Sequence, residues 1–202
     1  MTARSLKNGP RTTLLLGLIA ALLCGCAPVI IGGAAATGGA VAHDRRTTGS
    51  VVEDQTIGFK IRDRLNPQNG FTEESSDIGI SSFNGLVLLT GTVTDNALRQ
   101  RAETQAREVE KVRIVYNEIR LGPPSSMQED ADDLFITTQA KAELFHVEGQ
   151  GAIDPLRVSV TTVSGTVYLM GLLTRAEADA VTEEIRHIGG VNKVIRLFEY
   201  LD

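Results

Sequence analysis

The chain has 202 residues, 42% of them hydrophobic and 4% aromatic, and it lacks tryptophan. Its 20 Lys and Arg against 25 Asp and Glu give a formal net charge of −5. A general nucleic-acid binder needs a broad positive surface, which a chain with this negative net charge does not provide, so we expect no nucleic-acid partner. The core must rely on aliphatic side chains. Two modules of about seventy residues are small but can fold, especially if they pack on each other.

Residues 1–25 have the pattern of an export signal, with basic residues before an aliphatic run that is too short to span a bilayer. The run ends at Cys24-Gly25-Cys26, which resembles the bacterial lipobox and makes Cys26 the predicted lipidation site. Ala27 in place of Asp favours transport to the outer membrane, by resemblance to enterobacterial lipoproteins. The alternatives are an ordinary signal peptide cleaved nearby, or a Cys-x-Cys metal or redox pair.

Residues 26–54 are predicted to be a flexible tether behind the lipidated cysteine. Its first part is rich in glycine and alanine, and the glycines argue against a rigid helix. We therefore expect the first folded module to begin near Thr56.

The remaining sequence contains the same module twice. Each copy has a turn, a strand with a glycine near its end and a Thr that can begin a helix, and the flanking apolar positions repeat as well. Such a repeat indicates a duplicated structural unit. The offset is 79 or 80 residues at the paired positions Ile57/Ile136, Gly85/Gly165, Gly91/Gly171 and Val112/Val191.

The first module, residues 55–122, is predicted as helix, strand, strand, helix, strand. Its first helix ends near Pro67, and Asn84-Gly85 suits a hairpin turn because both central residues of that turn need positive φ. The strand at residues 86–93 is nearly continuous in apolar residues, so we expect both of its faces to be covered. The last strand is predicted over residues 112–121.

An acidic, Pro-containing linker, residues 123–133, leads into the second module, residues 134–202. This module repeats the order, with a helix over residues 134–145, a capping box at Thr174 and Glu177, and Gly190 ending the next helix. The predicted fold class is therefore α+β, with two tandem modules that each pack a small mixed three-stranded sheet against two helices.

The two modules resemble the BON domain, a family found in bacterial exported and membrane-associated proteins. Glu110 and Lys111 stand where the first copy should carry the glycine of the family's helix ending, so we expect that helix to end another way. The resemblance is carried by Gly85 and Gly91, by Gly165 and Gly171, and by the ending Gly190-Val191-x-x-Val194.

Two such modules behind a lipobox resemble outer-membrane lipoproteins associated with cell division and envelope stress. Residues 115–120, 136–138 and 168–172 support this likeness. The resemblance implies binding of an anionic phospholipid, phosphatidylglycerol or cardiolipin, through the second module, and a role in maintaining the outer-membrane barrier.

The first helix of the second module supplies the candidate lipid-binding residues. Its spacing turns Ile136, Ala140 and Leu144 inward and leaves an apolar rim beside a lysine, which would suit insertion among acyl chains with the ammonium near a phosphate. The alternative is that the two phenylalanines pack on the sheet or on the first module. The candidates are Phe135, Thr138, Lys141, Ala142, Phe145 and Leu172.

Other functions remain open at this point. The same phenylalanine face could dock a periplasmic partner, such as an assembly or cell-wall factor, and a purely structural stress protein is a third reading. We expect no enzyme, metal or cofactor: His43, His146 and His187 are scattered, and the serines lack a glycine-flanked nucleophile elbow.

Overall fold

The structure is a computed structural model that describes residues 44–147 and 153–202. The predicted signal, the lipidation site Cys26, His43 and most of the predicted tether lie outside the described residues. Gly39–Asp202 is a compact unit on its own and contains both predicted modules. None of the described helices is long and apolar enough to cross a membrane.

The first module has the predicted order of elements. Its sheet has the order β1-β2-β3, with β1 antiparallel and β3 parallel to β2, and the short β4 also pairs with β2. The elements are α3 (Thr48–Arg64), a 3-10 turn η1 (Pro67–Asn69), β1 (Ser76–Phe83), β2 (Leu86–Val93), α4 (Asn96–Arg107), β3 (Ile114–Asn117) and β4 (Arg120–Leu121).

The second module repeats this plan with the sheet order β5-β6-β7, again antiparallel and then parallel. Both modules are α+β units with two helices and a mixed sheet, which confirms the predicted fold class. The elements are α5 (Met127–Glu143), the 3-10 turns η2 (Leu144–His146) and η3 (Pro155–Arg157), β5 (Val158–Val163), β6 (Thr166–Leu173), α6 (Arg175–Ile185) and β7 (Lys193–Tyr200).

The first helix of each module is longer than the apolar spacing predicts. α3 begins at Thr48 rather than near Thr56, and α5 begins at Met127 rather than Leu134. The added turns carry few apolar residues, so side-chain caps define where they begin. The Thr47 side chain accepts a hydrogen bond from the Ser50 amide, and Ser126 forms a capping box with Glu129. The acidic run assigned to the linker is therefore largely helical.

The end of α4 corrects the expectation that this helix ends in another way than the helix before Gly190. Lys111 takes the left-handed conformation with φ 70°, as Gly190 does with φ 91°. The amide of Val112 donates to the Val109 carbonyl, and that of Val191 donates to the Ile188 carbonyl. Both modules thus use the same backbone turn, although a lysine adopts it less readily than a glycine.

The last strand of the first module is interrupted, whereas the prediction has one strand over residues 112–121. Between β3 and β4, the Glu118 amide donates to the Leu89 carbonyl and Ile119 is buried in the module's core. These two residues separate the two ladders to β2, and β7 of the second module has no such break.

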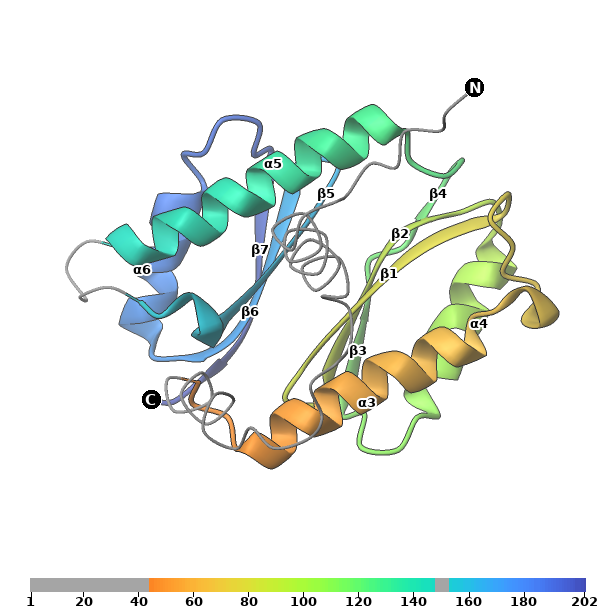
Figure 1. Ribbon diagram of the computed structural model, residues 1–202, viewed down its shortest axis with the longest axis horizontal. Coiled ribbons are helices and arrows are strands. Elements are labelled where there is room, and N and C mark those ends of the chain that lie inside the picture. Colours follow the sequence, from red (N-terminus) through yellow and green to blue (C-terminus); the bar gives the residue numbers. More distant parts are fainter. Residues whose placement is uncertain (1–43, 148–152) are drawn as a thin grey trace, which may run out of the picture. The chain divides into compact units, whose positions relative to one another are not determined.

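The central strand of each module is covered on both faces, as predicted for β2. Val87 and Leu89 face the helices of their own module, whereas Leu88 belongs to a third cluster formed by both sheets. The two sheets therefore pack against each other with the helices outside (Figure 1). The buried members of the shared cluster are Phe83, Leu86 and Leu88 from one module and Tyr168, Met170 and Leu197 from the other.

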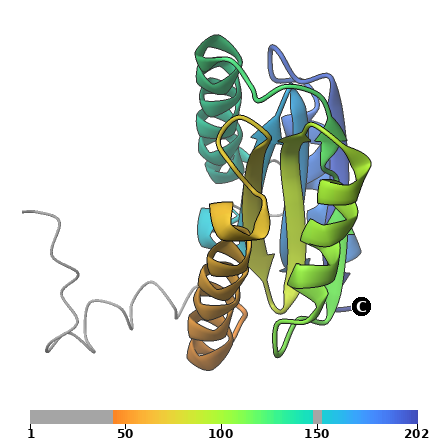
Figure 2. The same ribbon diagram turned by 90° about the vertical axis from the view of Figure 1, so that its right-hand side faces the viewer.

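The helices are distributed evenly over two sides of this arrangement. α3 and α5 lie on one side, towards the viewer in Figure 1 and at the left in Figure 2, and α4 and α6 lie on the other. The outer strands β1 and β5 also meet, because the hydroxyls of Ser81 and Thr161 lie 3.0 Å apart.

Candidate functional site

The outer surface of α5 and η2 is the candidate site, and the buried side of α5 positions it. Ile136, Ala140 and Leu144 recur at four-residue spacing and pack into the core of the second module. At the helix start, Glu129 accepts hydrogen bonds from the amide and hydroxyl of Ser126, which lower the pKa of that carboxyl. α5 is thus fixed along one stripe, and its opposite side faces solvent.

Five of the six candidate lipid-binding residues lie together on that exposed side. Phe135 is 60% exposed and Phe145 is 59% exposed, and Thr138, Lys141 and Ala142 are exposed between them. The two rings therefore do not pack on the sheet or on the first module. Leu134, 66% exposed, adds a sixth residue that the sequence analysis did not select.

Leu172, the remaining candidate, does not join this surface. It is half-buried and packs against the cluster between the two sheets, because it follows Tyr168 and Met170 along one face of β6. Its carbonyl accepts a hydrogen bond of 3.2 Å from Arg45. Alternation along a strand sends it away from α5.

The apolar character of this surface is not a requirement of the fold. At the offset of 79 residues, Phe135 corresponds to Thr56 on α3, and Phe145 corresponds to Asn66. Both polar residues belong to a module with the same topology and a complete core. The first module therefore folds without rings at these positions.

A buried or half-buried aspartate links each first helix to the hairpin turn of its module. Asp133 accepts from the backbone amides of Ser164 at 2.6 Å and Gly165 at 2.9 Å. Ser164 and Gly165 both have positive φ, 49° and 70°, as this tight turn requires. The two hydrogen bonds hold the turn against α5 two residues before Phe135.

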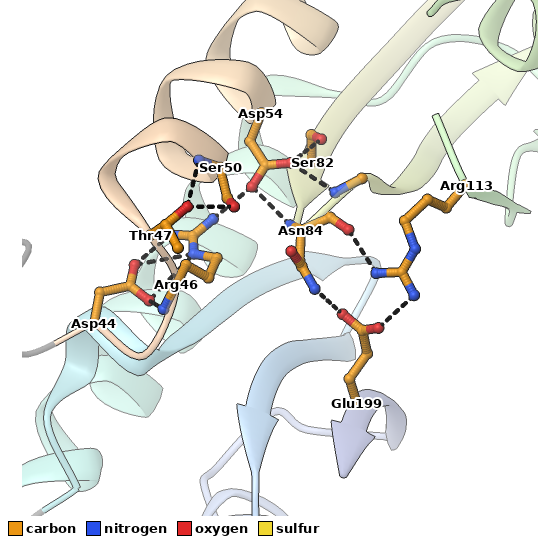
Figure 3. A network of polar contacts seen from close by, with 10 residues as sticks. Asp44, Arg46, Thr47, Ser50, Asp54, Ser82, Asn84, Arg113 and Glu199 are labelled. Atoms are coloured by element: carbon orange, nitrogen blue, oxygen red, sulfur yellow. Dashed lines mark hydrogen bonds and ion pairs between the residues drawn. The ribbon is translucent and has the colours of Figure 1, made fainter. Parts of the chain in front are cut away.

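Asp54 has the same role in the first module and is buried (Figure 3). It accepts from the amides of Asn84 at 2.6 Å and Gly85 at 2.9 Å, and from the Ser82 hydroxyl at 2.9 Å. The sequence analysis missed Asp54 and Asp133. Their separation of 79 residues, equal to the repeat offset, is the signal that could have revealed them.

The segment before α3 contacts both modules through two consecutive arginines. Arg46 donates to Asp54 at 2.7 Å, and its guanidinium carbon lies 3.9 Å from the centre of the Phe83 ring. Arg45 reaches the second module and donates to Glu177 at 2.6 and 2.7 Å. The hydrogen bonds from Arg45, followed by those from Thr174, lower the pKa of Glu177 to about 2 against the effect of burial.

The hairpin turn of the first module also contacts the last strand of the second. Asn84 donates from its side chain to Glu199 at 2.6 Å, and Arg113 donates to the other oxygen of the same carboxylate at 2.7 Å (Figure 3). The ion pair with Glu199 raises the pKa of Arg113. Together with the shared apolar cluster, these contacts join the two modules.

A hollow of about 470 Å³ lies beside the candidate surface, between Phe135 and the turn at Gly165. The equivalent hollow of the first module measures about 270 Å³. The hollow of the first module is lined by Lys111 and Arg113, and the corresponding residues in the second module are Gly190 and Asn192. The smaller residues leave more room next to the exposed ring.

The two histidines of the described residues lie near the ends of α5 and α6. His146 and His187 are exposed, and each lies within hydrogen-bond distance of a carbonyl four residues earlier. Over residues 44–147 and 153–202, no group of three His, Cys, Asp or Glu side chains could hold a metal ion. The exposed side of α5 and η2 offers apolar contact with Lys141 beside it.

Comparison with known proteins agrees with the repeated architecture. The BON domain family matches residues 53–123 and again residues 133–202. The chain is 36% identical over 180 residues to outer membrane lipoprotein DolP of Haemophilus influenzae, a match that covers 89% of this chain and 91% of that protein.

Two further relatives match more weakly. The 21 kDa hemolysin of Actinobacillus pleuropneumoniae is 33% identical over 158 residues, which cover 78% of this chain and 79% of the relative. Osmotically-inducible protein Y of Escherichia coli is 26% identical over 149 residues, which cover 72% of each chain. The chain therefore belongs to the BON-domain family, among the outer-membrane lipoproteins that carry two BON domains.

Proposed function

We propose that this protein binds anionic phospholipid through the exposed side of α5 and η2 in its second BON domain, and that this contact supports the integrity of the outer membrane. The observation that carries the proposal is the exposure of Phe135 and Phe145 beside Lys141 on one side of a single helix. The first domain has polar residues in place of both rings although its fold is the same.

The energetics favour insertion of the rings over long-range attraction. Full burial of a phenylalanine side chain contributes about 1.5–3 kcal/mol, so two rings would supply most of the affinity. From Leu134 to the end of the chain, nine Asp and Glu outnumber six Lys and Arg. Attraction to anionic lipid must therefore be local, and Lys141 is the cation placed to provide it.

The predicted lipid anchor would make such a weak contact sufficient. Acylation at Cys26, outside the described residues, would hold the domains close to the bilayer and raise the local concentration of membrane at the α5 surface. The contact then needs to orient the protein rather than to recruit it. A protein-binding adaptor, in which a periplasmic partner covers the same rings, is the competing function.

Co-sedimentation with vesicles separates the two functions, using the unacylated unit Gly39–Asp202. This unit suits the test because it is compact by itself and the described buried clusters lie within residues 57–198. We expect binding to vesicles that contain phosphatidylglycerol or cardiolipin, and little binding to phosphatidylcholine alone.

We expect Phe135→Ala and Lys141→Glu to weaken this binding. Arg99→Glu is the matched control for the charge change, because Arg99 is exposed on α4, and α4 lies on the side of the molecule opposite α5 (Figure 2). If neither substitution on α5 reduces binding and lipid composition has no effect, the phospholipid proposal fails and the adaptor function is favoured.

A further inference from the structure

The first domain also exposes a large ring on its first helix. Phe59 is 70% exposed on α3, and Val52, two turns earlier, is 57% exposed. Ile57 and Ile61 are buried against the sheet, so helical spacing places Phe59 on the outer side of α3. At the repeat offset, Phe59 corresponds to Thr138, which lies at the centre of the α5 surface.

Two cations flank this ring. Lys60 and Arg62 are exposed, and neither makes an ion pair or a side-chain hydrogen bond among the described residues. Acidic residues also lie beside the ring. Asp63 lines the same hollow as Phe59 and Lys60, together with Glu108 and Glu110 at the end of α4. Arg62 corresponds to Lys141 at the offset of 79, so the two domains carry an exposed cation at the same helical position. Each of these cations lies within one helical turn of an exposed phenylalanine.

The two helices lie on the same side of the molecule. Both face the viewer in Figure 1, with α5 at the upper left and α3 at the lower right, and both lie at the left in Figure 2, opposite α4. The outer strands between them meet at Ser81 and Thr161. The segment that leads from the predicted tether enters at the start of α3, where Arg46 is bound to Asp54. A bilayer on this side would meet both helices.

We propose that the first BON domain contacts the same anionic bilayer through α3, with Phe59 at the membrane surface and Lys60 and Arg62 near lipid phosphates. This inference rests on the proposed lipid contact of α5 and adds a second contact to it. The two domains contribute different side chains to the membrane contact: the second inserts two rings with one cation, and the first supplies two cations with one ring. The pair of contacts fixes the orientation of the protein on the membrane.

Single-site fluorescent probes test this geometry. Both cysteines of the chain precede Gly39, so a single cysteine can be placed in the unit Gly39–Asp202 without removing another. Thr56→Cys reports on α3, Thr138→Cys on α5 and Gln100→Cys on α4, and each leaves the exposed rings in place. Each variant is labelled with a dye whose emission shifts to the blue in an apolar environment.

On phosphatidylglycerol vesicles, we expect a blue shift at positions 56 and 138 and none at position 100. A shift at 138 without one at 56 overturns the second contact and leaves the α5 contact standing. No shift at 138 contradicts the proposed function itself. A shift at 56 that follows protein concentration without vesicles indicates self-association and also overturns the inference.

Charge reversal gives an independent measurement. We expect Lys60→Glu with Arg62→Glu to weaken binding to anionic vesicles at least tenfold, since each cation near such a surface is worth about fivefold, and to make binding less sensitive to salt. Arg99→Glu with Arg101→Glu, both exposed on α4, changes the net charge equally. Equal losses in the two double variants would show that only the net charge matters, against the inference.

Discussion

Asp54 and Asp133 occupy the same position in the two BON domains, and each accepts hydrogen bonds from the two backbone amides at the tip of its hairpin. The amide distances are 2.6 and 2.9 Å in both domains. A backbone amide that is covered by a helix needs a hydrogen-bond acceptor. The carboxylate meets that need and fixes the N-terminal half of the first helix against the hairpin turn.

Replacement of these aspartates should lower the free energy of unfolding by different amounts in the two domains. Asp54 is buried and also accepts from Arg46 and Ser82, so Asp54→Ala should lower the free energy of unfolding by about 2–4 kcal/mol. Asp133→Ala removes the two amide bonds from a less buried site and should cost about 1–2 kcal/mol. Urea unfolding of the unacylated unit measures both. An equal or reversed order would contradict the structure.

Glu177 should make the protein sensitive to acid. Its folded pKa of about 2 lies below the ordinary carboxyl value of 4.5, so its ionisation stabilises the protein above pH 4.5. This stabilisation is lost as the pH falls from about 4.5 to about 2, because the unfolded chain then binds the extra proton. We expect a contribution of about 2 kcal/mol at neutral pH, reduced by the partial exposure of Arg45.

The measurement is the urea midpoint between pH 5 and pH 2.5. Glu177→Gln should be less stable at pH 7 and should lose less stability over this range than the unmodified protein. Arg45→Gln should reduce the change of the urea midpoint over the same pH range, because the hydrogen bond from Arg45 is the largest cause of the lowered pKa of Glu177. If Arg45→Gln keeps the full pH dependence, the contact between the tether end and the second domain does not form in solution.

The glycines at the ends of the two central strands should differ in their tolerance of a side chain. Gly91 has φ 96°, and a Cβ there would collide with the Asp77 carbonyl of the neighbouring strand. Gly171 lacks a positive φ, and its Cβ would come 2.8 Å from the Arg157 carbonyl. Gly91→Ala should therefore cost more stability than Gly171→Ala, by at least about 1 kcal/mol. Thermal unfolding of the two variants compares them, and equal melting temperatures would contradict this difference.

Tyr168 should contribute to unfolding in alkali. Burial between the sheets, with a smaller effect from Glu118, raises the pKa of Tyr168 to about 12 from 10.0. Unfolding then releases a proton above pH 10, so stability falls as the pH rises towards 12. Tyr168→Phe should lose less stability between pH 9 and pH 11 than the unmodified protein, as measured by urea unfolding. An unchanged slope would indicate that the phenol is not buried.

Much of the fold follows from local sequence signals. The duplicated order of elements, the Asn84-Gly85 turn and the capping box at Thr174 each depend on residues close in sequence, and all are present in the structure. The starts of α3 and α5 were harder to predict, because their first turns carry polar residues without apolar periodicity. The conformation of Lys111 was also missed, since lysine does not ordinarily mark a left-handed residue.

The candidate surface was predictable to the extent that it depends on one helix. Four-residue spacing placed Phe135 and Phe145 on the outer side of α5, whereas Leu172 required knowledge of which face of β6 meets the other sheet. The contact of Arg45 with Glu177 joins residues far apart in the chain. Composition and periodicity carry no information about such a pair.

The central claim is that the rings of the second domain enter the bilayer. The most direct measurement is the partition coefficient of the unacylated unit onto phosphatidylglycerol vesicles, compared with that of a variant carrying Phe135→Ala and Phe145→Ala. We expect a loss of about 100-fold, since each ring contributes at least about tenfold when buried. Ile114→Ala, which shortens an exposed apolar side chain on β3, should leave the coefficient unchanged. A double variant that partitions as well as the unmodified protein would contradict the account.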